Sequence, residues 1–406
     1  MNAILRPYPV DALDQTPVVE SPRLRACGDG WLVEPSAAYS NAIENAIGTV
    51  RVPVGLAGPL RVHGRFARGD YPLPLATTEA SLVASYHRGA AVISEAGGCN
   101  VALLEERVSR SPGFVFENLS QALRFTDWAS AQTETWCRTA ADTGRYVQLI
   151  HVNPIVEGNH VYLVLGFTTG EAAGQNMVTL ATEAICRHID AQAPTKPRRS
   201  YIEANYCGDK KPCAASFTSV RGKRVTAEVV IPADVMRRRL RVTPQQLVDC
   251  WRMGAIGGAL SGAVGIQAQF ANGLAALFIA CGQDVACVAE SAVGVCRAEL
   301  TDEGDFYGAV TLPNVMVGTV GGGTGLPDQR RNLDLMGLSG PDSARALAEI
   351  CAGLCMAGEL SLCAALCSGD FARAHRALAR GRAARGRAQS NGSATETPEH
   401  PQERLR

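Results

Sequence analysis

The chain has 406 residues, of which 46% are hydrophobic, so it is long enough for roughly two or three domains with buried cores. Its 39 basic and 39 acidic residues cancel, which removes the usual charge argument for a protein that binds nucleic acid or anionic membranes. Any electrostatic role must therefore come from local clusters of charge.

The first 43 residues are predicted to form an irregular N-terminal segment, because prolines interrupt them repeatedly. A compact domain is expected from Glu44. The stretch "TTEASLVASYHRGAAVISEAGG" then predicts a helix that Thr77 or Thr78 caps and that the paired glycines end. Glu79 would lie in its first turn, near the positive end of the helix.

Residues 112–202 alternate strand patterns such as "HVYLVLGF" with helix patterns such as "NMVTLATEAICRHIDAQ". This alternation predicts a second, inserted α/β domain between two parts of the first domain, 44–111 and 203–380. Within the insertion, the turn "TTGEAAGQNM" could direct the backbone amides of Gly174 and Asn176 toward an anion. It lacks the GxGxxG spacing of a dinucleotide fingerprint.

The best candidate for a membrane span is the charge-free run 253–283. Polar residues interrupt it, and glycine and alanine dominate it, so tightly packed helices are expected instead. A final helix is predicted from Ser343, and the tail 381–406 is predicted to be disordered because it lacks aromatics and periodicity.

The cysteine pattern favours reduced thiols in a cytoplasmic protein. The chain has 14 cysteines, without paired CxxC motifs and without a secretory signal. Two cysteine pairs one helical turn apart, Cys351/Cys355 and Cys363/Cys367, have no histidine near them in sequence. They are interpreted as buried small apolar residues, and no metal is expected.

Two stretches contain the strongest candidates for catalytic residues. "ANYCGDKKPCAAS" places Asp209 beside Lys210 and Lys211. Alone this is a solvated turn, but its small apolar neighbours suggest partial burial, where charges need partners or a ligand and where a lysine can stabilise an oxyanion. Asp284 ends the apolar run "FIACGQD", and such a carboxylate needs a cation. Lys210 is the candidate partner, with Glu79 as a third member.

Three other features are weaker when taken singly. Arg145 reads as a surface ion-pair residue, and His375 lies among arginines, which is typical of a solvated basic face. The arginines of "VMRRRLRV" could bind phosphate. The run "GTVGGGTG" at 318–325 follows a strand pattern, but the next residues, "LPDQRR", are not expected to open a helix promptly, as a Rossmann turn would.

Taken in order, "ENAIGTVRVPVGLAGPL", "TTEASLVAS", "NYCGDKKP", "IACGQD", "GTVGGGTG" and "MAGELSL" followed by His375 resemble the hydroxymethylglutaryl-CoA reductase family. The resemblance spans about 44–380, and "NYCGDKKP" is similar to the class I form in its soluble catalytic portion. It implies an α+β protein: a large mixed α/β domain for substrate and CoA, with an inserted smaller α/β NADP-binding domain that is not a Rossmann fold.

The same resemblance implies the activity. It is the four-electron reduction of (S)-3-hydroxy-3-methylglutaryl-CoA to (R)-mevalonate and CoA with two NADPH, through a hemithioacetal and mevaldehyde. It also implies a homodimer or larger homo-oligomer with active sites shared between subunits. From composition and spacing, no metal, no membrane and no nucleic acid are expected as partners.

Residue by residue, the resemblance implies four groups of positions. The catalytic positions are Glu79, Lys210, Asp284 and His375. The substrate-binding positions are Arg110, Asp209, Lys211, Arg252 and Asn272. The CoA-binding positions are Ser85, Arg88 and Arg241. The cofactor-binding positions are Arg145, Gly174, Asn176, Met177, Gly321, Gly322 and Gly323.

The implied roles have a chemical logic. Lys210 would hold the carbonyl oxygen as it becomes an oxyanion. Glu79, kept protonated near Asp284, would give a proton to the aldehyde oxygen. His375 as an imidazolium would protonate the leaving CoA thiolate. Arg145 would contact the 2′-phosphate and favour NADPH over NADH.

The chain departs from the family pattern at several positions. Glu203 replaces a serine near the carboxylate-binding site, and Arg252 replaces a lysine. In the cofactor turn, "EAAGQNM" replaces "DAMGMNM". The other departures are Gly144, His87, Gln269 and Gly381, of which Gly381 replaces a phosphorylatable serine.

Three alternatives stay open. The same chemistry could act on a different acyl-CoA, as Glu203 and Arg252 would permit. The chain could be a CoA-dependent acyltransferase with Cys207, Cys213 or Cys281 as nucleophile. A non-catalytic CoA-binding protein is disfavoured, because all four catalytic positions are filled.

Overall fold

The computed structural model describes residues 39, 42–44 and 48–371. His375, Gly381 and the tail 381–406 lie outside the described residues, as does most of the predicted N-terminal segment. The chain divides into two compact units, Met1–Val52 and Pro53–Arg406. All helices and strands below belong to the second unit.

The larger sheet has six strands in the order β10-β11-β9-β3-β1-β2. Their bounds are β1 Val54–His63, β2 Arg68–Ala76, β3 Cys99–Glu106, β9 Lys223–Ile231, β10 Val295–Leu300 and β11 Phe306–Val315. The β1–β3 pair is parallel and the other pairs are antiparallel. Along β9, inward-facing residues are buried at every second position, as expected for a strand with one face on the core.

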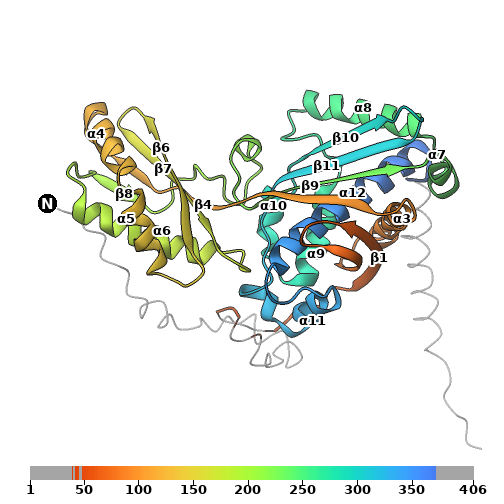
Figure 1. Ribbon diagram of the computed structural model, residues 1–406, viewed down its shortest axis with the longest axis horizontal. Coiled ribbons are helices and arrows are strands. Elements are labelled where there is room, and N and C mark those ends of the chain that lie inside the picture. The colour runs from red at the N-terminus through yellow and green to blue at the C-terminus, as the bar shows by residue number, and fades with distance from the viewer. Residues whose placement is uncertain (1–38, 40–41, 45–47, 372–406) are drawn as a thin grey trace, which may run out of the picture. The chain divides into compact units, whose positions relative to one another are not determined.

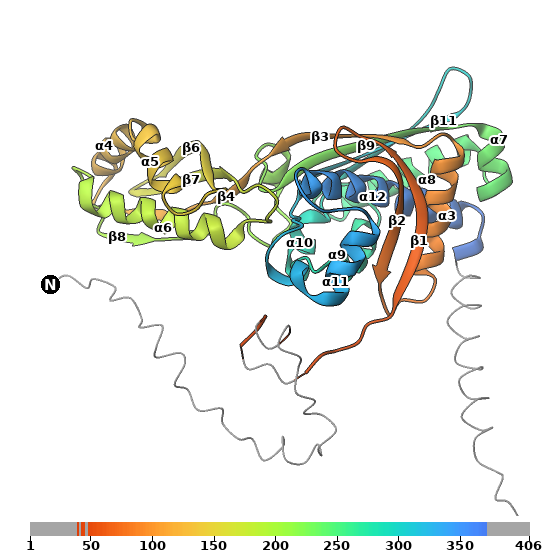
Figure 2. The same cartoon turned by 60° about the horizontal axis from the view of Figure 1, so that its bottom comes forward.

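Helices pack on this sheet. Their bounds are α3 Leu82–Glu95, α7 Ala233–Val235, α8 Pro244–Leu260, α9 Phe270–Cys281, α10 Val288–Ser291, α11 Pro327–Leu335 and α12 Ser343–Cys367. A short π-helix, Met236–Leu240, follows α7 directly. Figure 1 shows α9 and α12 lying against the sheet, and Figure 2 shows α3 alongside β1.

Helix α12 is the centre of this core. It contacts β3, β9 and β11 as well as α3, α8 and α9. Among the described residues it is the one helix long and apolar enough to cross a membrane by length and composition, and 78% of its most apolar window is buried inside the protein. Its apolar character is explained by packing on all sides.

The run 253–283 is not one helix, because an irregular segment separates α8 from α9. Tight packing was expected throughout and is found for α9. The prediction of tight packing is wrong for α8, where the residues Met253, Ile256 and Leu260 are 79%, 63% and 84% exposed. One apolar face of α8 therefore has no cover within the described part of the chain.

A second, smaller sheet has the order β4-β7-β5-β8, with β6 paired to β7. Its elements are β4 Val108–Arg110, β5 Gly113–Val115, α4 Leu119–Ser130, α5 Thr133–Ala141, β6 Gln148–Glu157, β7 His160–Thr168, α6 Gln175–Gln192 and β8 Arg199–Tyr201. Every pairing in it is antiparallel, unlike the parallel sheet of a Rossmann fold. The small sheet begins with β4 at Val108, and an inserted domain at 112–202 stays a prediction.

Two helix starts differ from the prediction. Helix α3 begins at Leu82, after Ser81 in a left-handed conformation with φ 73°, so Glu79 lies in a turn before the helix. The hydroxyl of Thr77 accepts a hydrogen bond from the Glu79 amide at 3.0 Å, and such local bonds compete with helix formation. Helix α11 does begin promptly after the glycine run, because Pro327 is favourable at the first helical position.

A buried carboxylate fastens α12 to the sheet. The Glu349 side chain is fully buried, and its oxygens accept hydrogen bonds from the amides of Phe66 at 2.9 Å, Ala67 at 2.7 Å and Leu103 at 3.3 Å. A side chain at Gly64 would collide with this carboxylate. The turn between β1 and β2 is therefore built around one acceptor on α12.

We expect Glu349→Ala to lower the free energy of unfolding by about 3 kcal/mol or more, because several buried amide donors lose their acceptor. Urea unfolding measures the change. Glu299→Ala is the control, since this exposed glutamate on β10 pairs with Arg297 on the surface, and its loss should cost less than about 0.5 kcal/mol. Equal losses in both variants would contradict the role of Glu349.

Candidate active site

Lys210 and Asp284 form an ion pair, with Lys210 Nζ 2.8 Å from Asp284 Oδ2. Asp284 follows the end of α9, and its other oxygen accepts a hydrogen bond from the Ala286 amide at 3.0 Å. Partial burial would raise the pKa of Asp284, but the Lys210 ammonium outweighs burial and holds that pKa below its usual value. The hydrogen bond to Asp284 in turn raises the pKa of Lys210. The two residues paired from the sequence do meet.

A buried network holds the backbone of this lysine. Lys210 has a left-handed backbone with φ 55°, and its amide donates to Glu290 Oε1 at 3.2 Å. The Glu290 carboxylate pairs with Arg221 at 2.6 Å, and both side chains are almost fully buried. Arg221 also pairs with Asp209. Asn314 donates to Glu290 at 2.9 Å, which satisfies a further lone pair.

Sequence reasoning missed Arg221, Glu290 and Asn314. The available signal was weak: each is a single polar residue within an apolar stretch, "SVRGK", "CVAES" and "TLPNV". A charge that is almost fully buried needs an opposite charge and hydrogen bonds, but the sequence alone does not say which groups supply them.

Arg110 ends β4 and faces the same loop. Its side chain is 9% exposed, and its NH1 lies 3.1 Å from Asp209 and 3.5 Å from Glu203. Its NH2 donates to the Thr179 hydroxyl at 3.0 Å. Glu203, which replaces the usual serine, therefore shares the very cation that is expected to hold a substrate carboxylate.

Lys211 stays on the open side of the loop. Its ammonium donates to the Asp209 carbonyl at 2.9 Å. It also lines a polar cavity of about 490 Å³, together with Tyr206, Cys207 and Asn314. Among the substrate positions, Arg110, Asp209 and Lys211 thus lie together beside the Lys210–Asp284 pair.

The glycine run lies against the turn of the small sheet. Val320 forms an isolated parallel bridge with Ala172, and the Thr319 amide donates to the Glu171 carbonyl at 2.8 Å. A side chain at Gly318 would collide with the backbone of Ala173. A Cβ at Gly323 would lie 2.8 Å from the Gly282 carbonyl at the end of α9. These two glycines serve close packing between backbones.

The middle of the run has a different character. Gly321 and Gly322 have φ of 82° and 55°, and a Cβ at either position would meet nothing within 4 Å. Positive φ explains why glycine is favoured there, and the open space leaves the backbone approachable. Gly321 and Gly322 therefore provide exposed backbone next to Gly323, which packs on Gly282, two residues before Asp284.

The residues present fit an anionic dinucleotide. Gly174, with φ 83°, precedes α6, and no side chain caps the 18-residue helix, so its first amides can face an anion. Asn176 and Met177 lie in that first turn. Arg145 is exposed, and its Cζ atom lies 5.3 Å from the centroid of the Tyr146 ring. Tyr146 in turn lies beside Gly170, at the start of the same turn.

Glu171, a departure from the family pattern, has a structural role in this chain. Its carboxylate accepts hydrogen bonds from the amides of Asp342 and Ala344, both at 2.7 Å, and from the Ser343 hydroxyl at 3.1 Å. The side chain of Asp342 does not cap α12. Glu171 therefore caps α12 from the turn of the small sheet.

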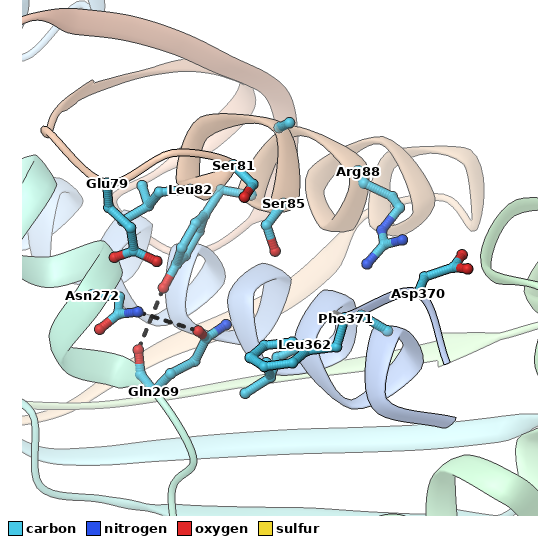
Figure 3. Close-up of a pocket in the computed structure, with 13 residues that line it drawn as sticks. Glu79, Ser81, Leu82, Ser85, Arg88, Gln269, Asn272, Leu362, Asp370 and Phe371 are labelled. Atoms are coloured by element: carbon cyan, nitrogen blue, oxygen red, sulfur yellow. Dashed lines mark hydrogen bonds between the residues drawn. The ribbon is translucent and has the colours of Figure 1, made fainter. Parts of the chain in front are cut away.

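A second cluster lines a separate cavity of about 240 Å³. Figure 3 shows Glu79 pointing toward Asn272, which lies in the first turn of α9. Asn272 donates to the Gln269 side chain at 3.5 Å, and Gln269 donates to the Gly358 carbonyl of α12 at 2.8 Å. Gln269, another departure, thus orients Asn272.

The predicted CoA positions come together at the other end of this cavity. Ser85 lies 2.9 Å from Ser361 between hydroxyl oxygens, and Arg88 donates to the Ser361 carbonyl at 2.7 Å. Arg241 lies 3.4 Å from Asp370. Cationic and hydroxyl groups therefore gather near the end of α12, as a phosphate-bearing ligand requires.

The two clusters lie at opposite ends of α9. Asn272 and Glu79 lie at its start and Asp284 follows its end; a helix of 12 residues is about 18 Å long. The expectation that Glu79 joins Lys210 and Asp284 is therefore not met within one chain. Arg252 joins neither cluster, since it is 63% exposed on α8 and pairs with Asp249.

Metal ligation has no support in residues 39, 42–44 and 48–371. No three histidine, cysteine, aspartate or glutamate side chains gather there as a metal site. Every cysteine in this part of the chain is a free thiol.

We expect Asp284→Asn to lower the free energy of unfolding at pH 7 by at most about 1 kcal/mol, since the pair is half exposed. Asparagine can keep the bond to the Ala286 amide, so the variant isolates the charge. Because folding lowers the pKa of Asp284, its contribution is present above the unfolded pKa and is lost as pH falls through the folded value. Urea unfolding should show the difference shrinking between pH 7 and pH 3; a difference that grows would contradict the assignment.

Comparison with known proteins gives one consistent family. The family model for hydroxymethylglutaryl-coenzyme A reductase matches residues 28–380. A 3-hydroxy-3-methylglutaryl-coenzyme A reductase of Pyrococcus abyssi is 39% identical over 357 residues, covering 86% of this chain and 87% of the relative. The enzyme of the same name from Aeropyrum pernix is 44% identical over 350 residues, covering 84% and 83%.

Solved structures show the same fold. The class II 3-hydroxy-3-methylglutaryl-CoA reductase of Streptococcus pneumoniae, bound to NADPH in open conformations, aligns with a TM-score of 0.65 and 22% identity, covering 85% of this chain and 93% of that one. At this identity the likeness concerns the fold alone. The class I character inferred from "NYCGDKKP" stays a prediction.

Proposed function

The chain belongs to the hydroxymethylglutaryl-coenzyme A reductase family, and on this premise we propose that it reduces (S)-3-hydroxy-3-methylglutaryl-CoA to (R)-mevalonate and CoA with NADPH. The observation that carries the proposal is the Lys210–Asp284 pair, which lies beside both the substrate loop and the open glycine backbone. A fixed ammonium next to an approachable backbone suits a carbonyl that gains negative charge.

Within this proposal, Lys210 stabilises the oxyanion at both reduction steps. Asp284 keeps the ammonium charged and oriented, while Glu290 fixes the lysine backbone from behind. Bound NADPH would supply the hydrides. Arg145, Gly174, Asn176 and Met177 would hold it from the antiparallel, non-Rossmann sheet, and Gly321 to Gly323 would hold it from the larger domain.

Arg110, Asp209 and Lys211 would bind or orient the acyl part of the substrate. The second candidate function, the same chemistry on another acyl-CoA, rests on Glu203, because this carboxylate lies 3.5 Å from Arg110. It would weaken a bond to an acyl carboxylate and would favour an acyl group that carries less negative charge.

Ser85, Arg88 and Arg241 would hold CoA near the end of α12. The chain continues from there toward His375, which we assign as the acid that protonates the CoA thiolate. Reference pKa values of about 6.5 for histidine and about 8.5 for a thiol make this transfer favourable.

The separation of the two clusters supports an active site shared between subunits. Glu79 and Asn272 of one subunit would complete the Lys210–Asp284 cluster of another. The exposed apolar face of α8, formed by Met253, Ile256 and Leu260, offers surface for such an assembly. A homodimer or a larger homo-oligomer is therefore part of the proposal.

The cysteine-based acyltransferase is disfavoured for two of its three candidate nucleophiles, Cys207 and Cys281. A nucleophilic thiol needs a lowered pKa, but burial raises the pKa of Cys207 to about 11 and that of Cys281 to about 12. Cys213 lies in the same loop as Cys207 and lines the polar cavity. The free thiols agree with the proposed cytoplasmic location.

We expect Lys210→Ala to lower kcat at least about a hundredfold, because a preorganised charge on the oxyanion is lost. NADPH oxidation and CoA release with the thioester substrate measure the effect, and the parent protein should oxidise two NADPH for each CoA released. Lys196→Ala is the control, since this exposed lysine donates a hydrogen bond to the Asp190 carbonyl within its own segment of the chain. Near-normal turnover in Lys210→Ala would refute the role; oxidation with another acyl-CoA alone would favour the second candidate.

Mixing two inactive variants tests the shared site. Glu79→Ala and Lys210→Ala should each be inactive, and after subunit exchange the mixture should regain up to about a quarter of normal activity, because half of the dimers are mixed and one of their two sites is intact. Each variant exchanged with itself is the control. No recovery, with subunit exchange demonstrated, would place both residues in one chain's site.

A further inference from the structure

Gln175 touches more of the site than any role assigned so far explains. It is the first residue of α6, and its amide nitrogen lies 2.9 Å from Cys287 Sγ and 3.5 Å from Asp284 Oδ2. The backbone carbonyl of Gln175 accepts a hydrogen bond from Arg110 at 3.3 Å. One residue at the start of the proposed cofactor helix therefore reaches both the proposed substrate arginine and the lysine's carboxylate partner.

The polarity of these contacts is fixed by chemistry. An ionised carboxylate only accepts hydrogen bonds, so the amide NH₂ of Gln175 must face Asp284. The family pattern "DAMGMNM", to which "EAAGQNM" was compared above, has methionine at this position, and a thioether has no donor. The contact thus comes from a residue that the sequence alone marks only as a departure from the cofactor motif.

Asp284 has few other fixed partners. Lys210 and the Cys287 thiol are the charged and titratable groups that face it among the described residues, and the Ala286 amide holds its second oxygen. Because the Asp284 side chain is 43% exposed, water competes for the oxygen that Lys210 uses. A donor from α6 limits that competition and orients the carboxylate.

We propose that Gln175 is a positioning residue, whose amide holds Asp284 toward Lys210 and ties the start of the cofactor-binding helix to the catalytic pair. This inference rests on the proposed reductase function. It means that the turn around Gly174, which would receive the cofactor, and the carboxylate that orients the lysine are mechanically joined through one side chain. Gln175 itself takes no proton and touches no reacting atom.

Two substitutions separate positioning from a merely structural role. Gln175→Ala removes the donor, and Gln175→Glu keeps the size but places a second carboxylate beside Asp284. We expect Ala to lower kcat about three- to tenfold and Glu to lower it further. The acid limb of the pH profile of kcat should move to higher pH in the order Gln, Ala, Glu, because loss of a donor and then repulsion each disfavour the ionised Asp284.

A structural role for Gln175 predicts the reverse order. In that case the isosteric Gln175→Glu would be milder than Gln175→Ala, and the acid limb would not move; either result would overturn the proposal. Gln192→Ala and Gln192→Glu are matched controls, since this exposed glutamine ends the same helix. Both should leave kcat and its pH profile unchanged.

A measurement without turnover keeps this inference distinct from the proposed function. Gln175→Glu should lower the urea midpoint at pH 7 in the parent protein, and the loss should largely vanish in an Asp284→Asn background, where the repelling charge is absent. An equal loss in both backgrounds would refute the contact. If the parent oxidised no NADPH with the thioester but this coupling appeared, the reductase proposal would fail while the Gln175–Asp284 contact stood.

Discussion

The site depends on the buried pair of Arg221 and Glu290. Both side chains are withdrawn from water, so each is tolerable only because the other is present. Asp209 pairs with Arg221 and Asn314 donates to Glu290, whereas Nε of Arg221 is buried without a hydrogen-bond partner in the described part of the chain. Glu290 also accepts the amide of Lys210, whose backbone would otherwise not favour a left-handed conformation. The partly exposed lysine is thus held by a framework whose central pair, Arg221 and Glu290, is almost fully buried.

The sequence predicted well what depends on local pattern. The final helix α12, the helix α6 of the small sheet and the strand β11 before the glycine run appear where periodicity placed them. Lys210 and Asp284 were paired from one argument, that a carboxylate ending an apolar run needs a cation, and the fold brings them to 2.8 Å.

What the sequence did not predict depends on contacts between distant segments. Thr77 bonds to the Glu79 backbone and delays α3, which no helix pattern reveals. Arg221, Glu290 and Gln175 acquire their roles from partners far along the chain. Glu79 lies at the start of α9 and Asp284, the partner of Lys210, follows its end, so the length of α9 separates Glu79 from Lys210. The packing of α9 on β2 fixes this arrangement, and no local pattern predicts it.

Glu171 connects two regions of the chain, the glycine run and the first turn of α12. Its backbone carbonyl accepts a hydrogen bond from the Thr319 amide in the glycine run, while its carboxylate caps α12. Any ligand that binds more tightly when this turn is ordered must therefore also favour an ordered first turn of α12, and the coupling holds equally in the other direction. Helix α12 extends to Ser361, whose carbonyl accepts a hydrogen bond from Arg88. One helix therefore joins the turn that we propose to receive the dinucleotide to the residues that we propose to hold the thioester.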